Sequence, residues 1–488
     1  MPESIVPLRL PYEPDNYLCT WTVPDGRGGI AELPGNLKVL PNRPPTGSIY
    51  GSVPLNSESP GVYSFPQVVE FCALAGTLAN GGSVVLLDAS ITYWSMGQGH
   101  ISGSAALLGK GREFFGRHSP RTAFDHASDV PLISSVKFQV TALDAVIGIS
   151  PIKSVQTPGI HPENPKDLWS ANLDLEAKGK WEVEDLSLTV GYEGRMRTMD
   201  GYEFRLAFSP VAELKVREGA SLRVVMDEFV EPLRRIICIA TGKVQDLTYV
   251  SVELMASSGV LQVFGTGIDQ KPFASSSNEI RSNSSAVRAK NDDLSLLDLI
   301  LKWRQYAATH HPLVETYGSM LHARDQHPRS RFLLLIQALE GLHGHEMKDK
   351  YNRRKMEHLS KRESVIVDLK DKVDSDTMRF LKKSLLKNPP TSLESALNAT
   401  VSDLPVNSMH HLAKTALVAD VISQPPAPTT AASALRVVRN NLAHGNRGYE
   451  EHKLDEVVRI LELIVRAHSL RILGCPDAVI ERVFKETK

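Results

Sequence analysis

This sequence has few cysteines, no long apolar runs and almost no net charge, and each of these features excludes a class of protein. Its cysteines, Cys19, Cys72, Cys238 and Cys475, are scattered without a C-x-x-C pair, which favours free thiols in a reducing compartment. No apolar stretch approaches the roughly 20 residues of a membrane helix. The N-terminus also lacks the basic start and apolar run of a signal peptide. We therefore expect a cytoplasmic protein with no membrane partner.

The formal net charge of −1 gives the chain no global attraction to nucleic acid. The charge is unevenly divided, however. Residues 292–488 hold 29 Lys and Arg against 25 Asp and Glu, whereas residues 1–291 hold 26 against 31. A chain of 488 residues is too long to form a single hydrophobic core, so we expect two or three domains. The C-terminal domain is expected to be mildly basic.

Several catalytic motifs are missing. The sequence contains no G-x-x-x-x-G-K-[ST] phosphate loop, no G-x-S-x-G and no Rossmann G-x-G-x-x-G in context, which disfavours ATPase, esterase and dehydrogenase chemistry. The histidines at 310–311, 343 and 345, and 410–411 stand at adjacent or alternate positions, which diverge on a helix and do not match a helical zinc site. We expect no metal and no cofactor.

Residues 1–267 predict a β-rich domain. Ser135–Val140 alternates cleanly between apolar and polar side chains, and glycines at 81 and 82 introduce the apolar run 84–87. The clearest hairpin is Gly191 to Phe208, turning at Asp200-Gly201. Its return strand lines one face with Tyr202, Phe204, Leu206 and Phe208. We predict an antiparallel sandwich or barrel-like sheet, interrupted by one helix around Met226–Ala240.

The composition changes after residue 267. Residues 268–291 are serine-rich and predict a linker or long surface loop. From there the periodicity is helical and indicates an antiparallel bundle over 292–488. Helices are expected near 292–323, 328–346, 352–387, 392–402, 409–423, 430–444, 451–473 and 477–485. The predicted fold class is α+β, with an N-terminal antiparallel β-rich domain followed by a C-terminal all-α bundle.

The helix expected at 430–444 carries the most informative pattern, because Arg439 and His444 stand near its end, separated by four residues. Thr429 or Thr430 can cap its start, and Gly445 is a good left-handed stop. A buried face is predicted from Leu435, Val438, Leu442 and Ala443.

The spacing of Arg439 and His444 has a geometric consequence. Five positions at about 100° each place them roughly 140° apart around an ideal helix, not on one face. A two-fold pairing of such helices brings two arginines and two histidines to one cleft. The spacing therefore favours a homodimer.

R-N-x-x-x-H at a helix end, preceded by the helix Arg331–His343, resembles the ApeA-like branch of the HEPN superfamily (higher eukaryotes and prokaryotes nucleotide-binding). The resemblance covers about 292–475, with a looser one over the N-terminal half. That branch includes bacterial anti-phage defence proteins, and its active relatives are metal-independent ribonucleases that work as dimers. The resemblance implies an abortive-infection ribonuclease, with residues 1–267 as a sensor that meets a phage-derived trigger.

For such a reaction His444 is the expected proton carrier, since an imidazole with an ordinary pKa of about 6.5 exchanges protons near neutral pH. Arg439 is expected to hold two phosphate oxygens. Asn440 contacts the ribose or phosphate, or only caps locally. Glu340 orients Arg439, acts as a second base or is structural, with Arg439 and Arg331 as its candidate partners. Arg436 extends the anion site or is solvated.

Basic residues also cluster between 348 and 362. Such a strip either grips RNA phosphates with little sequence preference or is a solvated helix face. The expected RNA contacts are Lys350, Arg353, Arg354 and Lys355. Two readings compete with a nuclease. One is a non-catalytic HEPN module that binds nucleotide or a partner, and the other is a β-domain receptor with a helical dimerisation tail.

Overall fold

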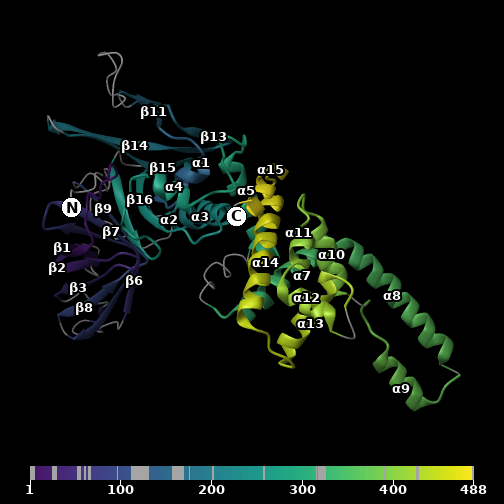
Figure 1. Cartoon of the computed structure of the whole chain (residues 1–488). Helices are drawn as coiled ribbons and strands as arrows, with labels where there is room; N and C mark the ends of the chain where they lie inside the picture. The colour runs from purple at the N-terminus through teal and green to yellow at the C-terminus, as the bar shows by residue number, and fades with distance from the viewer. Residues whose placement is uncertain are drawn as a thin grey trace, which may run out of the picture. The chain divides into compact units, whose positions relative to one another are not determined.

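The computed structural model describes most of the chain, and its two compact units are Met1–Ile300 and Leu301–Lys488. The described residues are 6–24, 30–51, 57–59, 62–63, 68–95, 97–110, 131–156, 170–174, 176–200, 203–255, 259–314, 316, 326–370, 372–389, 392–424 and 428–485. The first unit is β-rich and the second is helical, which confirms the predicted class (Figure 1). Among the described residues, none of the helices combines the length and apolar composition of a transmembrane span.

A 13-stranded antiparallel sheet forms the first unit, in the order β13-β14-β15-β10-β16-β17-β9-β7-β6-β1-β2-β3-β8. Because β7 also pairs with β8, the strands β7-β6-β1-β2-β3-β8 close into a six-strand barrel. The predicted barrel-like sheet is therefore confirmed. The barrel strands are β1 (Asp15–Pro24), β2 (Ile30–Val39), β3 (Thr46–Tyr50), β6 (Val68–Leu78), β7 (Gly82–Ser95) and β8 (Gln98–Ser102).

Strand β7 belongs to the barrel and to the open part of the sheet at once. Residues 82–87 pair with β9 (Ala105–Lys110), and residues 90–95 pair with β8. Between the two halves Asp88 has a φ of 46°, and the Ser104 hydroxyl donates to its carboxylate at 2.6 Å. This irregularity lets one strand change partners, as bulges at barrel rims do.

Trp21 fills the barrel interior and is fully buried. Two glycines on neighbouring strands make room for it. A Cβ on Gly35 would lie 2.8 Å from the indole Cδ1, and one on Gly76 would lie 3.0 Å from Cε3. The close approach of backbone to an aromatic ring requires glycine at both positions.

The open part of the sheet is covered by a short helical layer. The predicted helix at 226–240 is confirmed, with a π-helical turn inside it, and its stripe Phe229, Leu233, Ile236 and Ile237 is buried. The helices are α1 (Leu143–Ile147), α2 (Leu222–Val225), η3 (Met226–Val230) and α3 (Glu231–Thr241). The strands are β10 (Ile133–Val140), β13 (Gly179–Val183), β14 (Leu186–Asp200), β15 (Glu203–Ala220), β16 (Leu247–Leu254) and β17 (Val260–Gly265).

The predicted hairpin is confirmed as β14 and β15, with Asp200 opposite Glu203. Its turn residues Gly201 and Tyr202 lie outside the described residues, as does the side chain of Phe204. Two smaller hairpins are β4 (Ser57–Ser59) with β5 (Val62–Tyr63) and β11 (Ile152–Gln156) with β12 (Ser170–Leu173).

The serine-rich segment 268–291 lies within the first compact unit. It contains α4 (Ser277–Ser282), which the Ser276 hydroxyl caps, and it buries Ala286, Val287 and Ala289. The domain limits 1–267, 268–291 and 292–488 stay a prediction.

The second unit is the predicted helical bundle. Its core helices are α7 (Pro328–Glu346) and α14 (Glu451–Ile472), which pack along each other. The others are α8 (Lys348–Leu369), α9 (Ser375–Ser384), α10 (Leu393–Ser402), α11 (Ser408–Ala413), α12 (Ala416–Ser423), α13 (Ala431–His444) and α15 (Asp477–Lys485), and α5 (Leu296–Ala308) spans the limit between the two units.

Three helices predicted as continuous are shorter in the structure, so those predictions were wrong. The helix expected at 292–323 ends as α5 at Ala308, and His310 follows with a φ of 51° before Pro312. The helix expected at 352–387 breaks before α9, whose start Asp374 caps through its carboxylate. The helix expected at 409–423 divides into α11 and α12.

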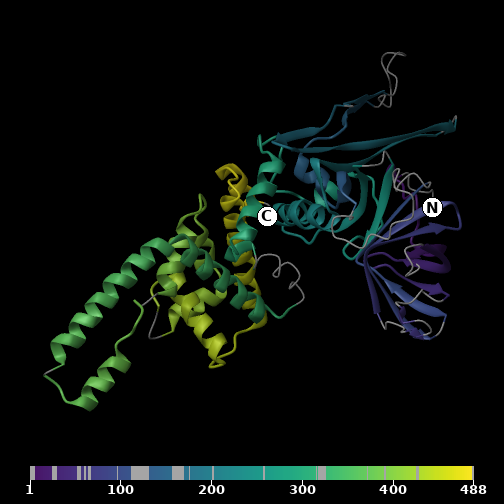
Figure 2. The ribbon, with the colours of Figure 1, turned by 180° about the vertical axis from the view of Figure 1, so that it is seen from behind.

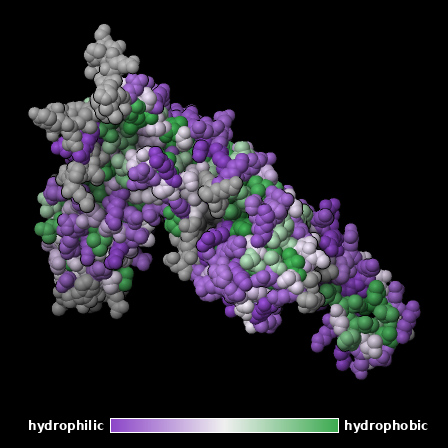
Figure 3. All heavy atoms as spheres, viewed as in Figure 1, coloured by the Kyte–Doolittle hydropathy of each residue, from purple (hydrophilic) through white to green (hydrophobic). Residues whose placement is uncertain are grey.

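Helices α8 and α9 project from one side of the bundle formed by α7 and α10–α14 (Figure 2). Neither contains a buried residue. Apolar side chains gather on the face of this pair that Figure 3 shows. Exposed apolar side chains of the two helices include Met356, Val367 and Phe380.

Candidate active site

Helix α13 carries the predicted motif, and its two ends are fixed by local hydrogen bonds. At the start, Thr430 and Ser433 form a reciprocal capping box. At the end, Gly445 adopts the left-handed conformation with φ 70° and donates its N–H to the carbonyl of Asn441. Thr430 and Gly445 are therefore confirmed as the limits of the helix.

One face of α13 packs into the bundle. Leu435, Val438 and Leu442 are buried, as predicted, but Ala443 is exposed, so that part of the prediction was wrong. On an ideal helix the first three lie within about 60° of one another, whereas Ala443 lies about 80° beyond Leu435 on the solvent side. The last turn of α13 is therefore only half covered.

Arg439 is held between two polar neighbours. Its Nη2 lies 3.8 Å from Glu340 Oε2 on α7, and its Nη1 donates to Asn440 Oδ1 at 3.3 Å. The side chains of Arg439 and Glu340 are 37% and 40% exposed, so water screens the pair and it stabilises the fold little. The contact limits the positions that the guanidinium adopts.

Of the two predicted partners of Glu340, the structure gives it Arg439. Arg331 lies elsewhere, because α14 packs along α7 and supplies Asp455 at 3.6 Å and Glu462 as its ion-pair partners.

His444 is the last residue of α13 and is exposed, as is Asn440. Within the described part of the chain, no hydrogen bond or ion pair joins the side chains of Arg439 and His444. The tip therefore presents an arginine, an amide and an imidazole to solvent, and its own bundle does not bury it.

Four residues that sequence reasoning missed hold the tip in place. The Arg329 guanidinium donates to the carbonyl of Leu442. The Asn441 amide donates to the Tyr449 hydroxyl at 2.7 Å, and the Arg447 guanidinium lies 5.3 Å from the Tyr449 ring centroid. No local pattern signals Arg329, because it reaches the motif from 113 positions away.

The other predicted cations are mostly exposed to solvent. Arg436 lies 3.9 Å from Glu394 and is largely exposed. In the strip on α8, Lys350, Arg353 and Arg354 are exposed and Lys355 is half-buried.

Two histidines from different pairs in the sequence meet in the bundle. The rings of His311 and His345 are 4.4 Å apart. Burial, with the nearby His345 and Arg471, lowers the pKa of His311 to about 4, and its Nδ1 accepts the N–H of Leu313. Even so, the described residues contain no group of three His, Cys, Asp or Glu side chains placed to hold a metal ion.

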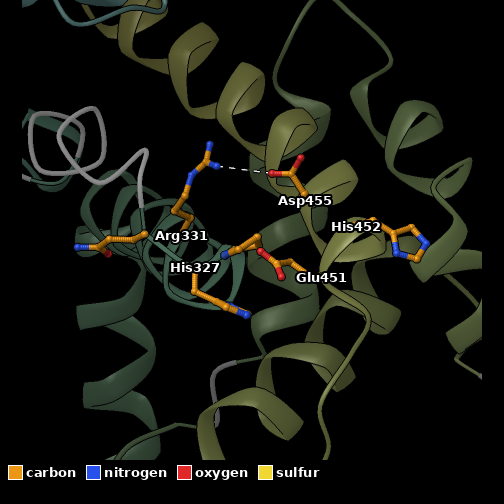
Figure 4. Close-up of a pocket in the computed structure, with 7 residues that line it drawn as sticks. His327, Arg331, Glu451, His452 and Asp455 are labelled. Atoms are coloured by element: carbon orange, nitrogen blue, oxygen red, sulfur yellow. Dashed lines mark ion pairs between the residues drawn. The ribbon is translucent and has the colours of Figure 1, made fainter.

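A pocket of about 640 Å³ lies where α7 and α14 begin. Figure 4 shows Arg331 directed toward Asp455 in this pocket, while the His452 ring points away from the other labelled side chains. The lining residues are Gln326, His327, Pro328, Arg331, Glu451, His452 and Asp455. None was predicted as a site residue, because the two segments lie more than a hundred positions apart.

Comparison with known families gives two matches. Residues 17–303, more than half of the chain, match the family described as ApeA N-terminal domain 1. Residues 333–478 match the Apea-like HEPN family and include Glu340, Arg439 and His444. Searches among curated proteins and among solved structures found no match.

Proposed function

The chain belongs to the ApeA family, with an N-terminal ApeA domain and an Apea-like HEPN domain, and we propose that it is a metal-independent endoribonuclease that acts in anti-phage defence by abortive infection. The observation that carries the proposal is the accessible tip of α13, where Arg439, Asn440 and His444 face solvent within the HEPN segment.

In the proposed reaction His444 takes the proton of a ribose 2′-hydroxyl. The 2′-oxygen attacks the adjacent phosphorus, the bond to the 5′-oxygen breaks, and that oxygen receives a proton from an imidazolium. The products are a 2′,3′-cyclic phosphate and a 5′-hydroxyl. Proton transfer of this kind contributes about 10²- to 10⁴-fold. Arg439 stabilises the negative phosphorane while Glu340 limits its position, and Asn440 contacts the ribose or phosphate.

We propose that the active form is a homodimer. Among the described residues, no hydrogen bond or ion pair joins Arg439 to His444, and their spacing turns them to different sides of one helix. Two copies paired through their α13 tips place both residue types around one phosphate. Arg436 and the α8 residues Lys350, Arg353, Arg354 and Lys355 then hold the RNA backbone.

The β-rich unit is proposed to restrain the nuclease until a phage-derived trigger binds, in the cytoplasm where RNA is present. A nuclease without restraint would kill its host, which gives a fused regulatory domain a purpose. If cells carrying a chain without residues 1–267 kept the same infection-dependent response, this part of the proposal would be wrong.

The test is incubation of the full chain with labelled RNA in EDTA, with and without an extract of phage-infected cells that supplies the trigger. We expect cleavage that leaves 2′,3′-cyclic phosphate ends and that disappears in His444→Ala and Arg439→Ala. His410→Ala and Arg223→Ala, at two exposed residues outside α13, serve as matched controls and keep full activity. RNA that binds but stays intact favours the non-catalytic module. Phage resistance that survives His444→Ala favours the β-domain receptor.

A further inference from the structure

The pocket between the starts of α7 and α14 has no part in the reaction above, yet its chemistry is specific. Its volume of about 640 Å³ lies within the range of small-ligand sites. Both acidic lining residues of α14, Glu451 and Asp455, stand four positions apart and so share one face of that helix.

Only one of these carboxylates is available to a ligand. Asp455 lies 3.6 Å from Arg331 and 2.8 Å from Arg459. Glu451 is exposed, and its carboxylate makes no ion pair or hydrogen bond with any residue that the structure describes. Because Glu462 also pairs with Arg331, the local charge is negative, which disfavours a phosphate here. The pocket suits a neutral group that is rich in N–H donors.

Hydrogen-bond donors are also present on the two helix starts that line the pocket. Glu450, where α14 begins, makes no side-chain capping bond, so the first N–H groups of the helix have no cap. His327 accepts the N–H of Arg329 through Nδ1 at 3.1 Å, so in the neutral imidazole the proton sits on Nε2.

The first turn of α7 connects the pocket to the candidate active site. His327, Pro328 and Arg331 line the pocket. Arg329, which lies between them in the sequence, donates to the carbonyl of Leu442, two residues before His444. On the other wall, α14 follows His444 after the short turn Gly445–Glu450.

We propose that this pocket is a base-binding subsite that prefers guanine in the RNA substrate; the inference rests on the proposed ribonuclease function. The Watson–Crick edge of guanine presents an acceptor, O6, beside two donors, N1–H and the N2 amino group. A carboxylate accepts both donors at once, and a backbone or imidazole N–H donates to O6. Adenine and cytosine present one amino group without an adjacent ring N–H, and uracil presents a single ring N–H.

The test measures nucleoside binding directly, so that it does not depend on cleavage. The full chain with His444→Ala is titrated with guanosine, adenosine, cytidine and uridine by saturation-transfer NMR. Guanosine should bind about tenfold or more tightly than the other three, as expected for a bidentate base contact. Glu451→Gln should remove that preference, because an amide offers one acceptor oxygen in place of two.

A matched control is Glu481→Gln on α15, outside the pocket, which should keep the preference for guanosine. Equal binding of all four nucleosides, no binding of any, or a guanosine preference that survives Glu451→Gln overturns the subsite. So does binding of spermidine at the pocket without guanosine, since that identifies a cation site.

A second experiment separates the guanine subsite from the proposed ribonuclease activity. The unsubstituted chain cuts a mixed-sequence RNA, and the cut sites are mapped. Cuts beside guanine that become indiscriminate in Glu451→Gln support both. Cutting without base preference and without guanosine binding leaves the nuclease intact and overturns the subsite. Guanosine binding that depends on Glu451 in a chain that cuts no RNA keeps the pocket and removes the nuclease.

Discussion

Two cation-bearing helices of the second unit, α13 and α8, are built in opposite ways. Helix α13 has a buried face, a capping box at its start and a left-handed glycine at its end. Helix α8 is longer, yet it buries no residue and has no side-chain cap at its start. The contrast separates two uses of positive charge. Chemistry needs a cation at a fixed position, whereas a hold on a polyanion needs only charge.

The largest expected effect concerns rate. His444→Ala should lower kcat about 10²- to 10⁴-fold. Replacing Lys350, Arg353, Arg354 and Lys355 together by alanine should leave kcat within about twofold, raise KM about tenfold and flatten its dependence on salt. Steady-state cleavage at two salt concentrations measures both. A comparable loss of kcat in the two variants would break the distinction between the helices.

The next effect concerns stability. Leu435→Ala removes a fully buried side chain from α13 and should cost about 2–5 kcal/mol. Met356→Ala on α8, where the side chain is 69% exposed, should change stability by less than about 0.5 kcal/mol. Urea unfolding of the full chain followed by helical circular dichroism compares them. A large cost at Met356 would show that a partner or a second copy covers α8.

Acidification should lower the stability of the bundle through two histidines in its interior. Burial, with the nearby Arg471, lowers the pKa of His468 to about 3, and the pKa of His311 is lowered to about 4. Between these values and the ordinary 6.5 the unfolded chain binds more protons than the folded one. Stability therefore falls as the pH falls below about 6.5, by up to about 1.4 kcal/mol per pH unit for each histidine, and is unaffected above it.

Urea midpoints between pH 7 and pH 4.5 measure that slope. The double variant His311→Gln and His468→Gln should show a shallower slope, and His410→Gln, which is exposed, should not differ from the unsubstituted chain. An unchanged slope in the double variant would mean that other groups cause the acid sensitivity.

The smallest effects have opposite signs at two glycines that both have open space around them. Gly445→Ala should cost about 1–2 kcal/mol, because its φ of 70° strains an L-residue. Gly344→Ala, inside α7, should stabilise by about 0.5–1 kcal/mol. Thermal unfolding gives both values. A stabilising Gly445→Ala would contradict the observed end of α13.

Local features of α13 were predictable because the sequence encodes them within a few residues. Thr430, Ser433 and Gly445 determine the ends of the helix, and the spacing of Leu435, Val438 and Leu442 determines its buried face. The break before α9 was also encoded, in the Asp374 cap, but the continuous polar pattern around it concealed the signal.

Contacts between distant segments were not predictable. Arg331 and Arg439 were both candidate partners of Glu340, with Arg439 the favoured one. The packing of α14 along α7, which gives Arg331 other partners, could not be predicted. The same holds for Arg329 at the tip of α13 and for the pocket lined by His327 and Glu451. The closure of the barrel through Asp88 depends on pairings between three strands, which no single window of sequence reports.

Strand β7 makes the barrel and the open sheet a single mechanical element. The same backbone donates to β9 on one side of Asp88 and to β8 on the other, so neither part rotates against the other unless a ladder of hydrogen bonds breaks. A force applied at the barrel rim therefore passes along one continuous chain into the sheet and is not absorbed by a hinge. Strand β7 therefore couples the barrel to the open sheet through one continuous backbone.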